Sequence, residues 1–169
     1  MQGQDIALLL KLAIQNESKI LSKDLAESLY LSPSEVSKSL KRSVESGMIH
    51  IANGDKRVNR SALIEFLSHG LKYVFPPAKG SLVRGVPTSV SAEPLKSHFQ
   101  DNGDPPEVWP YIEGKVRGAS LLPLYKGAPK AALRDLKFYS VLALCDAIRS
   151  GRTRERNLAI ELLCKEINA

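Results

Sequence analysis

Apolar residues recur with helical spacing at the start of the chain. Within residues 4–16 they occupy positions i, i+3, i+4, i+7 and i+8, as Ile6, Leu9, Leu10, Ala13 and Ile14. This spacing predicts an amphipathic helix with one buried stripe. A second, shorter helix is expected from Ser22, a favourable N-cap residue, to about Tyr30.

The strongest helix start lies at residues 32–35. Ser32 is followed by Pro33 and, three positions after the serine, by Glu35; this is a capping box with proline at the first helical position. The helix is expected to end near Ser46, because Gly47 can adopt the left-handed conformation of a C-terminal cap.

This third helix has two contrasting faces. At about 100° per residue, Val36, Leu40 and Val44 share one face. The opposite face is polar, with Lys41 at its edge and Ser37 on the flank nearer the core; it carries Ser34, Glu35, Lys38, Arg42 and Glu45. Small hydroxyls near the helix start can approach bases or phosphates closely. Lysine and arginine can reach phosphates, and Arg42 can also reach a guanine edge.

After Gly47 the pattern changes to short apolar runs. Residues 48–51 and 55–58 predict two strands, and the Asn53-Gly54 pair between them favours a tight turn. Ser61 is expected to cap a further helix that ends near Gly70. One α-helix fits the major groove of DNA, and a hairpin can reach the neighbouring groove or backbone. The order of elements therefore predicts a winged helix-turn-helix domain over residues 1–73.

The remainder of the chain has a different character. Seven of the ten prolines lie between Pro76 and Pro110. Residues 74–127 are therefore expected to be a proline- and glycine-rich extended segment with turns and one short strand pair, ordered by docking on the rest of the chain. A flexible linker over 76–107 is the alternative. Residues 129–150 and 153–168 regain helical spacing and predict an antiparallel helical hairpin within residues 128–169. The expected fold class is mainly α: an α+β winged helix, the extended segment and the C-terminal hairpin.

Composition adds a preference for anionic partners. The chain carries 24 Lys and Arg against 18 Asp and Glu, a net charge of +6, and basic side chains neutralise phosphates. No apolar run reaches the roughly 18 residues of a membrane span, and the N-terminus lacks the features of a signal peptide, so a cytoplasmic protein is expected. The three histidines lack metal-ligand spacing, and no nucleophile and base pattern stands out. We therefore expect no metal, no cofactor, no catalytic residue and no enzyme activity.

The N-terminal segment resembles bacterial winged-helix regulators of the MarR type. The resemblance is carried by three stretches: residues 25–29 (LAESL), 31–42 (LSPSEVSKSLKR) and 45–49 (ESGMI). It covers roughly residues 5–67. It implies groove contacts by Ser34, Ser37, Lys38, Lys41 and Arg42. It also implies wing contacts by Lys56 and Arg57, since Asp55-Lys56-Arg57 is similar to the family's Asp-x-Arg wing motif. The long dimer helix of the family is replaced here by the proline-rich segment and the hairpin.

Two functions follow as hypotheses. The first is a sequence-specific transcriptional regulator, expected to be a repressor, that binds double-stranded DNA as a homodimer held by the C-terminal hairpin. Its contact residues would be Ser32, Ser34, Ser37, Lys38, Lys41, Arg42, Lys56 and Arg57. The second is a protein-interaction module or antitoxin-like regulatory subunit that binds a partner protein through residues 74–169, with Trp109, Tyr111 and Tyr139 as contacts. The C-terminal half loosely resembles regulators encoded beside nucleotidyltransferase-type toxins.

Three further basic groups are open to more than one interpretation. Arg84 with Gly85 is interpreted as loop, or as an extended arm that enters a minor groove. Lys115 with Arg117 forms one cluster, and Arg149, Arg152, Arg154 and Arg156 form another. Each cluster is either solvated surface or a second contact with phosphate or an acidic partner.

Overall fold

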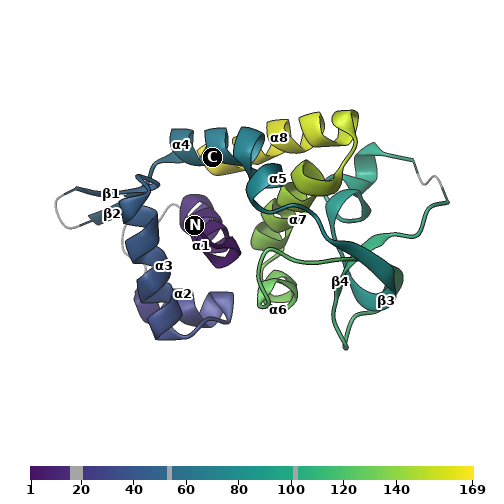
Figure 1. Ribbon diagram of the computed structural model, residues 1–169, viewed down its shortest axis with the longest axis horizontal. Helices are drawn as coiled ribbons and strands as arrows, with labels where there is room; N and C mark the ends of the chain where they lie inside the picture. The colour runs from purple at the N-terminus through teal and green to yellow at the C-terminus, as the bar shows by residue number, and fades with distance from the viewer. Residues whose placement is uncertain (16–20, 53–54, 101–102) are drawn as a thin grey trace.

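The computed structural model describes residues 1–15, 21–52, 55–100 and 103–169 (Figure 1). It is mainly helical with two small sheets, which confirms the expected class. The helices are α1 (Gly3–Gln15), α2 (Ser22–Leu29), α3 (Pro33–Glu45), α4 (Arg60–Glu65), α5 (Leu71–Val74), α6 (Ala128–Arg134), α7 (Leu136–Ser150) and α8 (Thr153–Asn168). The strands are β1 (Ile49–Ala52), β2 (Asp55–Val58), β3 (Lys79–Pro87), β4 (Glu107–Pro110) and β5 (Val116–Leu121).

Local signals set the bounds of α3 as expected. The Ser32 hydroxyl accepts from the Glu35 amide, and the Glu35 carboxylate accepts from the Ser32 amide, so the capping box is confirmed. Gly47 has a φ of 72° and ends the helix in the left-handed region. β1 and β2 then pair antiparallel, with Ile49 opposite Val58. The predicted turn at residues 53–54 lies outside the described residues.

The predicted bounds of α2 are confirmed, but two predicted capping residues are wrong. Ser22 is the first residue of α2, and the residue before it, Leu21, makes no side-chain cap. The cap of α4 is Asn59, whose side chain accepts from the amide of Ala62, so Ser61 is already within the helix. In each case a polar residue with high capping propensity lies inside the first turn instead of before it.

The predicted stop at Gly70 is also wrong. The chain continues from α4 through a π-helical turn, Phe66–Gly70, into α5. Leu63, Leu67 and Leu71 are all buried at a spacing of four residues. The apolar stripe thus extends past the glycine, and the burial of Leu71 outweighs the low helix propensity of Gly70.

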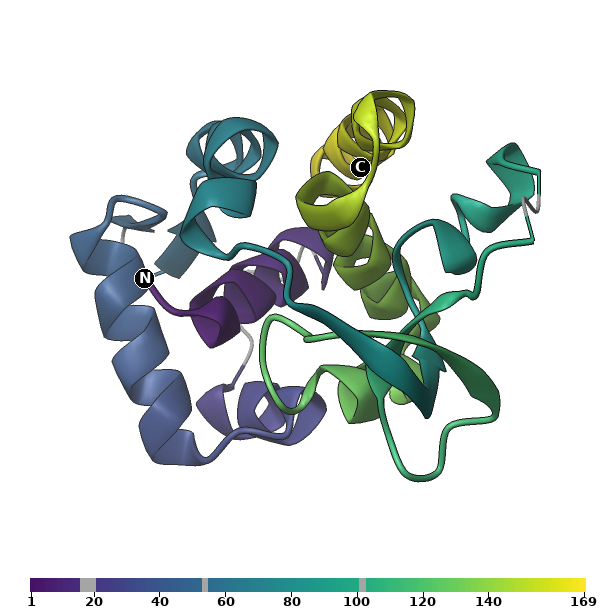
Figure 2. The ribbon, with the colours of Figure 1, turned by 45° about the vertical axis from the view of Figure 1, so that its right-hand side comes forward.

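α1 lies at the centre of the molecule, between α3 and α7 (Figures 1 and 2). The sequence predicts one buried stripe, but Ile6 to Leu10 are five consecutive residues with no exposed surface. α1 packs on α2 and α3 on one side and on α7 and α8 on the other. The single-stripe prediction was wrong because the C-terminal helices cover the face that a free N-terminal domain would expose to water.

The proline-rich segment is folded, so the flexible-linker alternative is wrong for its described part. β3 pairs antiparallel with both β4 and β5, and β4 pairs parallel with β5, which closes a small three-stranded barrel. Two glycines permit this closeness. A Cβ on Gly85 would lie 2.0 Å from the Trp109 carbonyl oxygen, and one on Gly118 would lie 2.0 Å from the Pro106 carbonyl oxygen. Arg84 and Gly85 are part of β3, so they do not form a free arm.

A buried polar cluster fastens this barrel to α7. The Asp146 carboxylate accepts from the Thr88 hydroxyl (2.8 Å), the Trp109 indole (2.5 Å) and the Arg149 guanidinium (2.6 Å). Arg149 also donates to the carbonyl oxygens of Phe75, Pro76 and Leu122. These carbonyls belong to the two chain segments that lead into and out of the barrel. The interpretation of Arg149 as a surface cation is therefore wrong.

The predicted helix over 129–150 is divided at Asp135. Its carboxylate accepts from the Phe138 amide and so caps α7, while its backbone ends α6 in an extended conformation. α8 packs on α7 through Ala159, Leu163 and Ile167. α7 is buried from Val141 to Arg149. A dimer through the C-terminal hairpin would therefore have to use α8 or the exposed start of α7, because residues 141–149 are enclosed by the rest of the chain.

Candidate nucleic-acid interface

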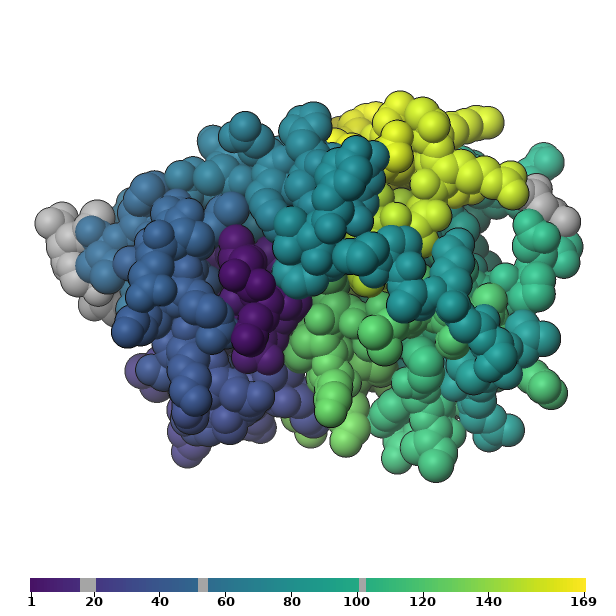
Figure 3. Space-filling model, viewed as in Figure 1, coloured from purple at the N-terminus to yellow at the C-terminus, as the bar shows by residue number. Residues whose placement is uncertain are grey.

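α3 lies at one end of the long axis of the molecule, beside the β1–β2 hairpin (Figures 1 and 3). Its inner face packs on α1 and α2. Four residues predicted to contact DNA are exposed on its outer face: Ser34, Ser37, Lys38 and Lys41. The helix thus presents a polar, solvent-facing surface.

Ser32 and Glu35 are tied to each other at the start of α3. The Ser32 hydroxyl donates to the Glu35 carboxylate at 2.8 Å while it accepts from the Glu35 amide. The backbone amide and hydroxyl of Ser32 hold the pKa of the Glu35 carboxyl below its usual value. Ser32 is exposed, but its hydroxyl serves the helix cap.

Lys38 and Lys41 are the cations of the outer face. Lys41 is 3.9 Å from the Glu45 carboxylate, and the two side chains are 79% and 61% exposed. Such a loose pair in water contributes little and opens readily when phosphate competes for the ammonium group. Both lysines are therefore accessible to a phosphate backbone.

Arg42 does not belong to this outer face, and its predicted outward position is wrong. Its guanidinium donates twice to the carboxylate of Asp5 on α1, from Nε at 2.9 Å and from Nη2 at 2.6 Å. The Ser39 hydroxyl donates to the same carboxylate at 2.6 Å. Burial opposes ionisation of Asp5, but the hydrogen bonds from Arg42, Ser39 and the Gln2 amide outweigh it and lower the pKa of this carboxyl.

The buried polar residues of α3 explain this difference. Ser39 and Ser43 have no exposed surface, and both lie against the side on which α1 packs. At 100° per residue, the buried face that includes these two serines is centred roughly 50° away from the centre of the predicted face, which was set by Val36, Leu40 and Val44. This rotation draws Arg42 inward and turns Ser37 and Lys41 outward. Asp5 is the key residue that sequence reasoning missed, and no local pattern marks it.

The hairpin carries its two cations on opposite faces. Register pairs Lys56 with Ile51 and Arg57 with His50, and residues directly opposite each other share a face. Ile49 is buried against the core and so marks the inner face of the hairpin. Ile51 and its partner Lys56 lie on the same face, nearer the tip of the hairpin. Arg57 therefore lies on the outer face, and both cations are exposed.

The charge of the candidate interface is modest. Its cations are Lys38, Lys41, Lys56 and Arg57, and its carboxylates are Glu35, Glu45 and Asp55. The net formal charge of this surface is thus one positive charge. Arg42 adds nothing outward, since Asp5 neutralises it. A strong phosphate-binding surface would need cations from elsewhere in the molecule.

The predicted partner contacts are mostly internal. Trp109 is 1% exposed, and its indole N–H donates to Asp146, so its assignment as a surface contact is wrong. Tyr139 is half-buried beside the Trp109 ring, with its hydroxyl bonded to the Pro87 carbonyl oxygen. Tyr111 is also half-buried, and its hydroxyl donates to Glu113 at 3.2 Å. All three side chains hold the barrel and its turn in place.

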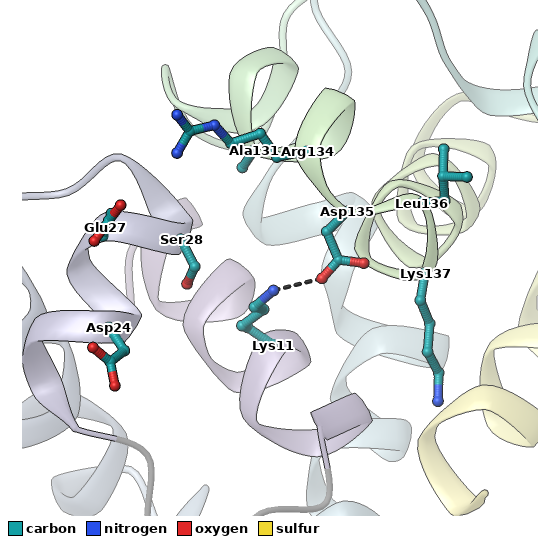
Figure 4. A pocket seen from close by; sticks show the side chains of 9 residues that line it. All are labelled: Lys11, Asp24, Glu27, Ser28, Ala131, Arg134, Asp135, Leu136 and Lys137. Carbon is teal, nitrogen blue, oxygen red and sulfur yellow. Dashed lines mark hydrogen bonds and ion pairs between the residues drawn. The ribbon is translucent and has the colours of Figure 1, made fainter.

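An open cleft of about 670 Å³ lies between α2 and the α6–α7 junction (Figure 4). Asp24, Glu27 and Ser28 line it on the α2 side, and Arg134 lies on the opposite side. At its floor the Lys11 ammonium donates to Asp135 at 2.5 Å. The α2 wall of the cleft is thus acidic, and the opposite wall carries a guanidinium.

The comparisons with known proteins add no relative. No family model, no curated protein and no solved structure matches the chain. Within the described residues, none of the helices has the length and apolar character needed to cross a membrane.

Proposed function

We propose that this protein is a DNA-binding transcriptional regulator whose residues 1–74 act as a winged helix-turn-helix. In this proposal α2 supports α3, and α3 enters the major groove with Ser34, Ser37, Lys38 and Lys41 toward the DNA. The β1–β2 hairpin serves as the wing, with Lys56 and Arg57 near the backbone. Repression is the expected mode of regulation.

One observation carries the proposal. α3 is a capped helix whose outer face is exposed along its length, and this face is lined by small hydroxyls and lysines. A groove-reading helix must be rigid and uncovered, since bases are reached only by side chains that the protein itself leaves free. The contacts of α3 with α1 and α2 supply the rigidity and leave the opposite face open.

The test begins with a selection of bound sequences from a random duplex library. The selected duplex is then titrated with the wild type and with the double variant Lys38→Ala/Lys41→Ala at several salt concentrations. The variant should bind roughly tenfold or more weakly at 0.1 M salt, and its salt slope should fall by about two, because each lost phosphate contact removes about one.

The matched control is Lys96→Ala/Lys165→Ala, which removes two exposed lysines outside the α3 surface. Lys165 forms an (i, i+4) pair with Glu161, much as Lys41 does with Glu45. The control should bind the selected duplex as the wild type does. If no sequence is enriched in the selection, or if the α3 variant matches the control, the proposal is wrong.

A second candidate is a protein-interaction module, and exposed apolar side chains favour it. Leu133 and Leu136, on either side of the α6–α7 junction, are 54% and 78% exposed. Leucine at this exposure is common at protein interfaces when it is grouped with a polar rim. Substitution of both with Ser should abolish co-purification of a stoichiometric partner if this function holds.

The homodimer expected for a regulator is tested by light scattering of the purified chain.

A further inference from the structure

Two arginines lie side by side on neighbouring strands of the barrel. β3 and β5 pair so that Arg84 is directly opposite Arg117. Both are exposed, and neither forms an ion pair or a side-chain hydrogen bond with any described residue. Like charges directly opposite on paired strands are destabilising. The fold therefore maintains a concentration of positive charge that its own carboxylates do not neutralise.

A third cation joins them at the turn between β4 and β5. The backbone of Gly114 lies against that of Gly85, because a Cβ on Gly114 would be 2.3 Å from the Gly85 carbonyl. Lys115 follows this contact and is exposed. The carboxylate nearest in the chain, Glu113, accepts from the Tyr111 hydroxyl. Three cations against this one carboxylate leave an excess of positive charge, and we name Arg84, Lys115 and Arg117 the barrel cluster.

Two more cations connect the barrel cluster with the start of α3. Lys130 and Arg134 of α6 lie over the ring of Tyr30, at 5.9 Å and 5.1 Å from its centroid. Tyr30 is the C-cap of α2, two residues before the cap of α3. The backbone of Gly127, just before α6, lies against the end of α2, because a Cβ on Gly127 would be 2.6 Å from the Leu29 carbonyl oxygen.

These elements lie along one edge of the molecule. In Figure 2 the start of α3, α2, α6 and the turn between β4 and β5 follow one another along the lower edge. The start of α8 and the segment around residues 96–100 lie at the upper right, away from this edge. The elements that carry Lys130, Arg134 and Lys115 therefore form a band that begins where the candidate groove-reading helix begins.

We propose that the barrel cluster, together with Lys130, binds the phosphate backbone of the DNA that flanks the α3 site. This inference rests on the proposed function, since α3 must position the same duplex. Opposed residues on paired strands have Cβ atoms about 5 Å apart, so the guanidinium groups of Arg84 and Arg117 can converge on one phosphate or on two neighbours. Guanidinium is the side chain best suited to bidentate phosphate binding.

The position of the band fits an extended duplex. A chain of this size has a radius of gyration of roughly 15 Å, and thus a span of about 40 Å. One helical turn of DNA is about 34–36 Å long. The two phosphate contacts would therefore lie about one turn apart, and the second would add affinity without adding sequence preference.

The experiment compares two lengths of the selected duplex. One has about 12 base pairs centred on the α3 site, and the other has about 30 base pairs with the same centre. Arg84→Ala/Arg117→Ala should bind the long duplex roughly tenfold more weakly than the wild type at 0.1 M salt, with a salt slope lower by about two. It should bind the short duplex within twofold of the wild type.

The charge-matched control is Lys96→Ala/Arg154→Ala, which removes two exposed cations from the segment Lys96–His98 and from the start of α8. It should match the wild type on both duplexes. If alanine lowers the melting temperature, Arg84→Gln/Arg117→Gln keeps the aliphatic part of each side chain without its charge and must show the same loss of affinity for the long duplex.

The outcomes separate the two proposals. If the wild type binds, and Lys38→Ala/Lys41→Ala weakens binding, but the arginine variant matches its control on the long duplex, then the barrel cluster does not contact DNA. The same conclusion follows if the arginine variant loses affinity equally on both lengths. If the wild type binds no duplex, the proposed function itself fails.

Discussion

The contact between Asp5 and Arg42 gives the sharpest test of how α3 is used. Arg42→Ala removes two of the four hydrogen-bond donors of a carboxylate that has no exposed surface; the Ser39 hydroxyl and the Gln2 amide remain. Removing one partner of a buried ion pair costs about 3–5 kcal/mol. The Arg42 side chain is 27% exposed, so water can reach part of the vacated space, and a loss of about 2–3 kcal/mol is expected.

This loss is measurable by thermal unfolding at neutral pH. For a chain of this length each kcal/mol shifts the melting temperature by about 2–4 °C, so Arg42→Ala should melt about 4–12 °C lower. Asp5→Asn combined with Arg42→Ala in a double-mutant cycle should give a coupling of about 1–2 kcal/mol, because the two side chains are in direct contact.

The pH dependence has a defined sign. The Asp5 carboxyl has a folded pKa below its ordinary value of 3.8, so the stabilisation is fully present above about pH 4 and is lost as pH falls through the folded pKa. The stability difference between wild type and Arg42→Ala should therefore be largest near neutral pH and should shrink as the pH falls. It shrinks because Asp5 in the variant stays buried without its cation and gains a proton at a higher pH than Asp5 in the wild type.

The neighbouring residue supplies the control. Lys41→Ala removes an exposed cation and should change the melting temperature by about 1 °C or less, while it weakens DNA binding. Arg42→Ala should show the reverse: lower stability, and DNA binding within a few fold of the wild type when measured well below its melting temperature. Unchanged stability of Arg42→Ala together with lost DNA binding would refute the inward position of Arg42.

Three further substitutions test other parts of the fold. Arg149→Ala leaves the Asp146 carboxylate buried without its cation and should cost about 3–5 kcal/mol, with a change in tryptophan fluorescence on the barrel side. Gly85→Ala places a Cβ 2.0 Å from a carbonyl oxygen of the adjacent strand and should cost about 1–3 kcal/mol in urea unfolding; Gly80→Ala meets only a rotatable serine hydroxyl and should be near neutral. Ser32→Ala removes the α3 cap and should cost about 1 kcal/mol, measured by thermal melting, with no cost if the cap were unimportant.

The elements that could be predicted are those with local causes. The start of α3 depends on Ser32, Pro33 and Glu35, which are adjacent in the chain, and its end depends on Gly47. The pairing of β1 with β2 likewise follows from short apolar runs separated by a turn signal. In these cases the partner of each hydrogen bond lies within a few residues, so a single stretch of sequence contains both halves of the interaction.

The features that could not be predicted depend on distant partners. Arg42 is held by Asp5, 37 positions earlier, and Trp109 by Asp146, 37 positions later. An exposed arginine and a buried one look the same in a helical wheel when the residue that neutralises the charge lies on another helix. The barrel was missed for a related reason. Its strands are rich in glycine and proline, and Gly85 and Gly118 are needed for close backbone approach where propensity favours turns.

The central position of α1 links these findings to function. α1 holds α3 through Asp5 on one side and packs on α7 on the other, and α7 in turn holds the barrel through Asp146 and Arg149. The first and last of these links are buried charged groups with several hydrogen bonds, and such groups favour one geometry over others. The outer face of α3 and the arginines of the barrel therefore keep a fixed separation. A rigid pair of surfaces can engage one duplex at two places without a further loss of conformational entropy, because the ordering is already complete in the folded protein.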